Sequence, residues 1–192
     1  MASRCPEIGM APARLLRFAV LALALAAGPA LGQTAEPDGY RIEDYRAPVP
    51  ATLKGATVID AAGLERMIRS SPVVLIDVLP QPPRPDKLPP DTLWRPPARH
   101  DIPGSVWLAN TGFGAVSPEM EAYFHDALAA LTLGDPARPL VFYCEANCWM
   151  SWNAARRAVA EGYTAVHWFP GGMQDWTAAN RPTLPNTPLP VK

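Results

Sequence analysis

The amino-acid sequence predicts a single α/β domain in which helices flank a central parallel sheet. Two observations carry this prediction. Apolar runs typical of strands alternate along the chain with stretches of helical periodicity, and such alternation is typical of parallel sheets covered on both faces. Residues 73–78, apart from Asp77, and residues 139–143 are continuous apolar runs. Runs of this kind are expected in strands that are buried on both faces.

The first strand and helix are expected near the start of this domain. Residues 57–59 predict a short strand, and Asp60 is placed to cap the N-terminus of the helix that follows. Leu64, Met67 and Ile68 recur at helical spacing, which predicts that they form the buried face of this helix.

The middle of the chain combines an irregular segment with a well-marked helix. Residues 79–101 contain eight prolines and predict an insertion without regular structure, after which residues 102–108 return to a strand. Ser117-Pro-Glu gives the next helix a cap, a proline at its first position and an acidic first turn. The apolar residues of this helix form a stripe: Met120, Tyr123, Phe124, Ala127, Leu128 and Leu131.

The C-terminal part repeats the strand–helix order twice. Residues 139–143 predict a strand and residues 151–161 a helix. Residues 165–169 predict the last strand, and residues 173–180 predict the last helix. The proline-rich tail, residues 182–192, is expected to be extended.

The first 32 residues have the features of a secretory signal. Arg14 and Arg17 form a basic region, residues 18–27 an apolar stretch too short for an ordinary membrane span, and residues 30–32 a small-residue cleavage site. The alternative is a retained membrane anchor. The expected organisation is therefore a signal peptide, residues 1–32, an extended lead-in, residues 33–56, and a folded domain, residues 57–181.

The charge and cysteine content limit the classes of partner. Cleavage would leave about 160 residues, enough for one domain with a real core, and would shift the net charge from −1 to about −3. This balance argues against a nucleic-acid or acidic-membrane partner. Cys5 would leave with the signal, so Cys144 and Cys148 would be the only cysteines of the exported protein. A single close pair outside the cytosol indicates redox or sulfur chemistry rather than a disulfide scaffold.

The segment Cys144-Glu-Ala-Asn-Cys148-Trp149 is the strongest functional signal. It joins the end of a strand to the start of a helix, where backbone N–H groups and the helix dipole stabilise a thiolate. We expect Cys144 to be the nucleophile and Cys148 the resolving thiol that closes a disulfide. The other residues expected to form the substrate-binding loop follow these cysteines: Glu145, Ala146, Asn147, Trp149, Met150 and Ser151. Trp149 is expected to lie on the loop, where it would cover the sulfur or dock a partner.

The order of these landmarks resembles that of a rhodanese domain, over roughly residues 57–181. The matching pieces are the strand-end Asp77, the segment His100-Asp-Ile-Pro-Gly, the strand-end Tyr143-Cys144, Ser151 with Ala154-Ala155, and Gly171-Gly-Met-Gln-Asp-Trp176. The resemblance implies a rhodanese-like α/β fold and sulfurtransferase chemistry. Asp77 is expected to order loop amides near the site. His100 is expected to be a loop residue hydrogen-bonded to backbone, with contact to substrate as the alternative.

The chain also resembles a narrower subgroup, over nearly all of the expected mature protein. The Cys-x-x-x-Cys-Trp loop and the segments Gly39-Tyr-Arg, Asp44-Tyr-Arg-Ala-Pro and Ser117-Pro-Glu-Met-Glu-Ala-Tyr are similar to those of exported rhodanese-like proteins associated with PQQ-dependent alcohol catabolism. This resemblance implies a periplasmic location. It also implies a PQQ-dependent dehydrogenase or a cytochrome as partner.

Two departures from the family bear on the substrate. The arginine that usually stands two residues after the strand-end aspartate is Leu79 here, and the arginine before the loop serine is Met150. A loop without its cation is expected to bind dianions such as thiosulfate poorly, and Met150→Arg is expected to improve thiosulfate use.

Three uses of the cysteine pair are open from the sequence. The first is thiol–disulfide or sulfane-sulfur transfer, with a small sulfur donor or a protein thiol or disulfide as partner and no cofactor of the protein's own. The second is a static disulfide in a non-catalytic accessory protein of a quinoprotein dehydrogenase. The third is a metal or cofactor carrier in which Cys144, Cys148 and Met150 are joined by His100 or His167. We expect the first.

Overall fold

The computed structural model describes Met1 and residues 34–191 of the 192-residue chain. The expected signal peptide and its cleavage site fall on residues 2–33, outside the described residues. Among the described residues, no helix is both long enough and apolar enough to cross a membrane.

The central sheet has five strands in the order β1-β6-β5-β2-β4, and every neighbouring pair is parallel. Along the chain the strands are β1 (Thr57–Val58), β2 (Val74–Asp77), β4 (Val106–Trp107), β5 (Leu140–Tyr143) and β6 (Val166–Trp168). The predicted parallel sheet is thus confirmed. Strand β5 lies in the middle of the sheet, so the chain that leaves its carboxyl end is surrounded by protein.

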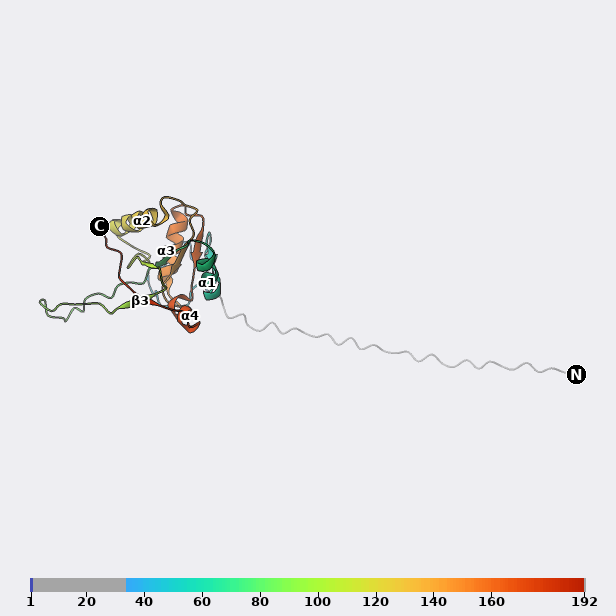
Figure 1. Cartoon of the computed structure of the whole chain (residues 1–192), viewed down its shortest axis with the longest axis horizontal. Coiled ribbons are helices and arrows are strands. Elements are labelled where there is room, and N and C mark those ends of the chain that lie inside the picture. Colours follow the sequence, from blue (N-terminus) through green and yellow to red (C-terminus); the bar gives the residue numbers. More distant parts are fainter. Residues whose placement is uncertain (2–33, 192) are drawn as a thin grey trace. The chain divides into compact units, whose positions relative to one another are not determined.

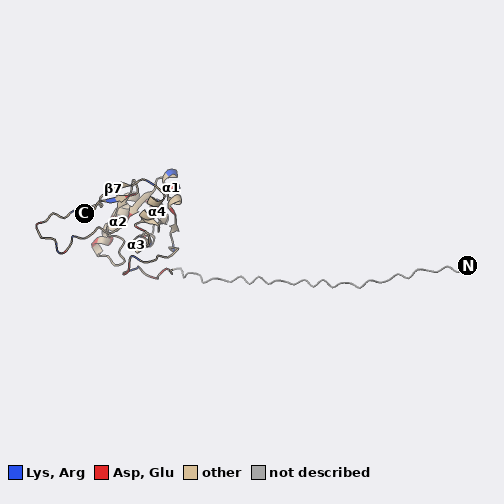
Figure 2. Ribbon diagram, turned by 90° about the horizontal axis from the view of Figure 1, so that it is seen from below, with Lys and Arg blue, Asp and Glu red and all other residues tan. Residues whose placement is uncertain are grey.

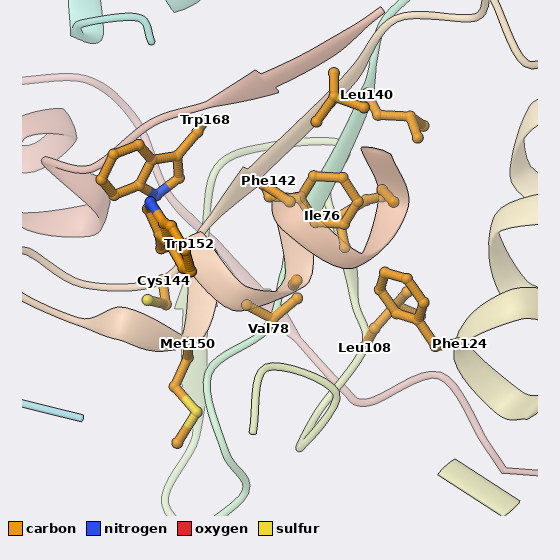
Figure 3. Packing of buried hydrophobic residues seen from close by; sticks show 14 of the residues in the cluster. Ile76, Val78, Leu108, Phe124, Leu140, Phe142, Cys144, Met150, Trp152 and Trp168 are labelled. Carbon is orange, nitrogen blue, oxygen red and sulfur yellow. The ribbon is translucent and has the colours of Figure 1, made fainter. Parts of the chain in front are cut away.

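Two helices cover each face of the sheet (Figure 1). The helices are α1 (Ala61–Ser70), α2 (Pro118–Thr132), α3 (Trp149–Ala160) and α4 (Gly172–Ala178). Because side chains alternate along a strand, Leu140 and Phe142 of β5 pack with α2 and α3, whereas Val141 and Tyr143 pack with α1 and α4. Figure 3 shows the first of these clusters.

The predicted starts of α1 and α2 are confirmed. The Asp60 carboxylate accepts a hydrogen bond from the Gly63 amide at 2.7 Å, and the Ser117 hydroxyl accepts one from the Met120 amide at 3.3 Å. The buried face of α1 is narrower than predicted. Leu64 is fully buried and Met67 is partly buried against the core, but Ile68 is exposed.

A second, two-stranded sheet corrects one expectation and agrees with the extended tail. Strand β3 (Arg99–Asp101) pairs antiparallel with β7 (Leu184–Asn186), and the two lie side by side in Figure 1. The expected lack of regular structure over residues 79–101 is therefore wrong for the last three residues, and the tail is held to the domain. The Asn186 amide group donates to Asp101 Oδ2 at 2.9 Å and to the Ser105 carbonyl at 3.2 Å. These bonds stabilise a pairing that has no hydrophobic pattern of its own.

The turn before α4 packs against the backbone that follows β5. Gly172 has a φ of +52° and forms an antiparallel bridge with Glu145. The amide of Met173 donates to the Cys144 carbonyl at 3.1 Å. A Cβ at residue 172 would lie 2.6 Å from that same oxygen, so only glycine permits this approach.

We expect Gly172→Ala to lower the free energy of unfolding by about 3 kcal/mol, because it combines left-handed strain with a backbone clash. Gly134→Ala is the matched control: its φ is +77° but nothing lies within 4 Å of an added Cβ. That variant should lose only about 1 kcal/mol. Urea denaturation monitored by tryptophan fluorescence measures both. If both variants lost the same free energy of unfolding, the clash with the Cys144 carbonyl would contribute nothing to the loss in Gly172→Ala.

Candidate active site

The five residues 144–148 connect β5 to α3 at the carboxyl end of the sheet. Cys144 continues the alternation of β5 and so points to the same side as Phe142, toward α3 (Figure 3). Cys148 is the N-cap residue of α3. The two residues are 0 % and 2 % exposed, and both are free thiols. The site is thus a pair of reduced cysteines beneath the protein surface.

The polar groups around Cys144 do not favour its thiolate. Its sulfur lies 3.8 Å from the Glu145 carbonyl oxygen and 3.6 Å from the Cys148 carbonyl oxygen, which are acceptors for a protonated thiol. Burial raises the pKa of Cys144 well above its ordinary value, and the Cys148 sulfur raises it further, whereas Ser151 opposes the shift. The amide cradle expected around Cys144 does not form around this sulfur.

The loop amides instead face Cys148. The Cys144 thiol and the amides of Met150 and Glu145 lie near the Cys148 sulfur and lower its pKa. With the nearby positive charge of Arg46, these groups lower the pKa of Cys148 to about 7, against the opposing effect of burial. The surroundings thus favour the thiolate at Cys148 over the thiolate at Cys144.

The lead-in covers this pair. Arg46 forms an antiparallel bridge with Cys148, and the Trp149 amide donates to the Tyr45 carbonyl at 2.9 Å. Asn153 of α3 holds the lead-in more firmly, because its side chain accepts from the Arg41 amide at 2.9 Å and donates to the Arg41 carbonyl at 2.8 Å. The predicted lead-in is thus a wall of the site.

Trp149 and Met150 do not lie on the loop as expected. Helix α3 begins at Trp149, two residues before the predicted start, and both side chains are buried. The Trp149 ring packs edge-on against Trp152 at 5.3 Å between centroids, with the Arg41 guanidinium 5.4 Å from its centre. Met150 packs so closely on Gly112 that a Cβ there would lie 2.6 Å from the Met150 Cβ. An arginine at residue 150 would be buried, so the expected benefit of Met150→Arg has lost its basis.

The remaining loop residues form a tight turn. Asn147 is exposed at its tip with a φ of +51°, a conformation that asparagine tolerates better than most residues. The Ala146 amide donates to the Gln174 side chain of α4 at 2.8 Å. Ser151 is fully buried and accepts from the Trp168 indole at 3.0 Å. The Ala146 contact ties the loop to α4, whereas Ser151, expected on the loop, lies within α3 and ties that helix to β6.

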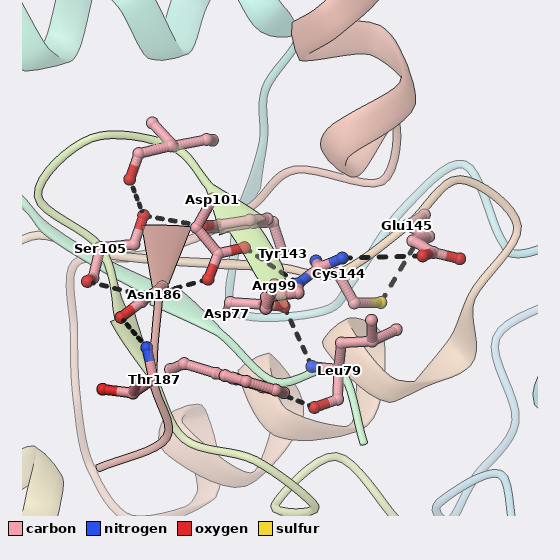
Figure 4. Close-up of polar contacts among 12 residues, drawn as sticks. Asp77, Leu79, Arg99, Asp101, Ser105, Tyr143, Cys144, Glu145, Asn186 and Thr187 are labelled. Carbon is pink, nitrogen blue, oxygen red and sulfur yellow. Dashed lines mark hydrogen bonds and ion pairs between the residues drawn. The ribbon is translucent and has the colours of Figure 1, made fainter. Parts of the chain in front are cut away.

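Asp77 belongs to a buried ion network beside the loop (Figure 4). Arg99 lies 2.7 Å from Asp77, 3.0 Å from Asp101 and 3.7 Å from Glu145. Burial raises the pKa of Asp77 to about 7, and Asp101 adds to the shift that Arg99 opposes. The amide that Asp77 accepts from is that of Leu79, at 3.0 Å, rather than one of residues 144–148.

His100 is not brought to the thiols. It lies exposed on β3, opposite Pro185 of β7. His167 lies on β6, where its Nδ1 is 3.2 Å from the Ala165 carbonyl oxygen. Within the described part of the chain, no group of three or more His, Cys, Asp or Glu side chains is placed to hold a metal ion. The carrier alternative therefore gains no support from these residues.

Two arginines of the site were not predicted. Arg99 pairs with Asp77, but it lies 22 residues further along the chain, near the end of the insertion. A buried strand-end aspartate requires a cation, and this requirement was the signal that could have found it. Arg46 comes from the lead-in, and no local pattern marks it.

The assignment of the lower pKa to Cys148 can be tested directly. Absorbance at 240 nm should show one thiolate forming with a midpoint near pH 7, and Cys148→Ser should remove this step. Cys144→Ala should move the midpoint toward higher pH, because the sulfur of Cys148 loses its main hydrogen-bond donor. The same midpoint in Cys148→Ser as in the unmodified protein would assign the thiolate to Cys144 instead.

Solved structures with related architecture include three sulfur-transfer or rhodanese-like proteins. The polysulfide-sulfur transferase of Wolinella succinogenes is 18 % identical, covering 68 % of this chain and 79 % of its own, with a TM-score of 0.43. A human single-domain sulfurtransferase is 20 % identical, covering 64 % and 96 %, with a TM-score of 0.41. A rhodanese-like domain from Anabaena is 17 % identical, covering 66 % and 76 %, with a TM-score of 0.42. No curated protein matches the chain significantly.

The family model of the rhodanese-like domain matches residues 60–179. This range begins just before α1 and ends just after α4, and it includes the whole five-stranded sheet except β1. The match covers more than half of the chain, and the observed parallel sheet with two helices on each face agrees with it. The chain belongs to the rhodanese-like domain family.

Proposed function

We propose that this protein transfers sulfane sulfur or exchanges disulfides through the pair Cys144 and Cys148. The single observation that supports this most strongly is the placement of two free, adjacent thiols at the start of α3, with Arg46 beside Cys148. This setting lowers the pKa of Cys148, whereas burial raises the pKa of Cys144. A thiolate near neutral pH is the form that attacks sulfur, and a second thiol in contact can displace what was bound.

The two half-reactions balance with the same two residues. The Cys148 thiolate attacks a disulfide R–S–S–R′, forming Cys148–S–S–R and releasing R′S⁻. Cys144 then attacks the Cys148 sulfur, giving the Cys144–Cys148 disulfide and RSH. A sulfane donor R–S–SH would leave a persulfide on Cys148 and release RSH, and Cys144 would convert that persulfide to the disulfide and hydrogen sulfide. In each case the dithiol is oxidised by two electrons, and an external thiol reductant resets it.

Access to the pair is expected from the side of Arg46. Both sulfurs are buried. The side chain of Arg46, the residue that bridges to Cys148, is 57 % exposed. A donor that displaces this side chain meets Cys148 before Cys144. The order of access therefore agrees with the order of reactivity.

We expect Cys144→Ser to trap an adduct on Cys148 when the reduced protein meets a small disulfide, because the thiol that would displace it is absent. Intact-mass spectrometry and peptide mapping measure the adduct. Cys148→Ser is the matched control and should give little adduct. A stable adduct on Cys144 in that control would restore the sequence-based assignment, with Cys144 as nucleophile.

A non-catalytic accessory protein with a structural disulfide is the second candidate. The observation that favours it is the burial of both sulfurs. It predicts no adduct in either single variant. It also predicts a marked loss of stability when the pair is reduced, whereas a cycling pair should differ little in stability between its two states.

We further propose a periplasmic setting in support of PQQ-dependent alcohol catabolism. The support is the signal-like N-terminus together with the resemblance of the lead-in and the Cys-x-x-x-Cys-Trp loop to exported proteins of that subgroup. A PQQ-dependent dehydrogenase or a cytochrome would be the protein partner.

Loss of the protein is expected to slow growth on an alcohol oxidised by a PQQ enzyme, but not growth on succinate. A gene deletion complemented with the unmodified protein or with Cys148→Ser tests this, and only the former should restore growth. Mass spectrometry of the complementing protein should find a mature N-terminus at Gln33. Equal rescue by both versions would remove thiol chemistry from this role.

A further inference from the structure

Glu145 lies between the thiols and two arginines. It directly follows Cys144, and its carboxylate pairs with Arg46 from the lead-in and lies 3.7 Å from Arg99 of β3. Figure 4 shows Arg99 and Glu145 beside the Cys144 sulfur. The backbone of Glu145 is fixed by its bridge to Gly172, so the side chain has a defined direction toward both guanidinium groups.

This carboxylate occupies the place where an anionic substrate would find its cations. Arg46 and Arg99 are the two basic side chains of the thiol site. Arg99 Nη2 is buried without a hydrogen-bond partner among the described residues, so it can still donate. Arg46, in contrast, is largely exposed and its ion pair with Glu145 can open at modest cost.

The charges around the pair sum to a negative value. The carboxylates of Asp101 and Glu145 offset the two arginines, and Asp77 and Cys148, each with a pKa of about 7, add partial negative charge near neutral pH. A dianion such as thiosulfate would be repelled and would also lose its hydration in this buried site. An uncharged disulfide loses no such hydration, and the sulfurs lie in an apolar cluster that includes Trp149, Met150 and Trp152.

We propose that Glu145 is a specificity-determining residue that excludes inorganic sulfur dianions and directs the site toward uncharged disulfides. This inference rests on the proposed function, because it names the substrate class of the same thiol pair. Its physical basis is that Glu145 neutralises the cations of the site and contributes the negative charge nearest to Cys144 along the chain.

The test compares Glu145→Gln with Glu65→Gln. Glu65 lies on α1, whose arginines are visible in Figure 2, and it likewise pairs with two arginines, Arg69 and Arg181. The Glu65 variant thus removes an equivalent carboxylate far from the thiols. Calorimetry measures thiosulfate binding to the reduced proteins. Single-turnover oxidation of the pair is followed with thiosulfate, which leaves as sulfite and sulfide, and with bis(2-hydroxyethyl) disulfide, which leaves as two thiols.

Glu145→Gln should bind thiosulfate about tenfold more tightly, because one negative charge beside the dianion is gone. The ratio of the oxidation rates with thiosulfate and with the uncharged disulfide should rise by a similar factor, and 0.5 M salt should reduce the gain. Glu65→Gln should show neither change. Unaltered thiosulfate affinity in Glu145→Gln would overturn the inference. Absence of oxidation by both reagents in the unmodified protein would instead overturn the proposed function, since the calorimetry does not depend on turnover.

Discussion

The direction of the amide groups between β5 and α3 is the constraint on which the site depends. Helix α3 begins without a hydrogen bond from an oxygen-bearing cap, and the sulfur of Cys148 stands at that position. The same amides cannot also serve Cys144, whose sulfur faces two carbonyl oxygens. A single backbone path therefore shifts the pKa values of two chemically identical side chains in opposite directions.

Local sequence signals predicted the fold well. Caps such as Asp60 and Ser117 and the buried strand that ends at Asp77 depend on neighbouring residues, so they can be recognised from a short stretch of chain. The pairing of β3 with β7 could not be predicted in this way. Its partners are 85 residues apart and are joined by Asn186 rather than by a hydrophobic pattern.

In the candidate site, too, the residues that were predicted are those marked by a local sequence signal. Cys144, Cys148 and Ser151 were recognised because strand, loop and helix are contiguous in the sequence. Arg46 and Arg99 were not, because ion pairs between distant elements leave no periodic trace. The early start of α3 was missed for a related reason: the amide of Trp149 has its partner, Tyr45, in the lead-in.

The two hydrogen bonds between the Asn153 side chain and the Arg41 backbone join residues that are 112 positions apart. The lead-in is made at the start of synthesis, but its binding surface on α3 exists only after most of the chain has emerged. Contacts so distant in sequence close slowly, since the loop entropy must be overcome first. The bridge that sets Arg46 beside Cys148 is thus among the last parts of the molecule to form. A newly made chain holds two ordinary thiols, and chemical asymmetry between them marks the completed fold.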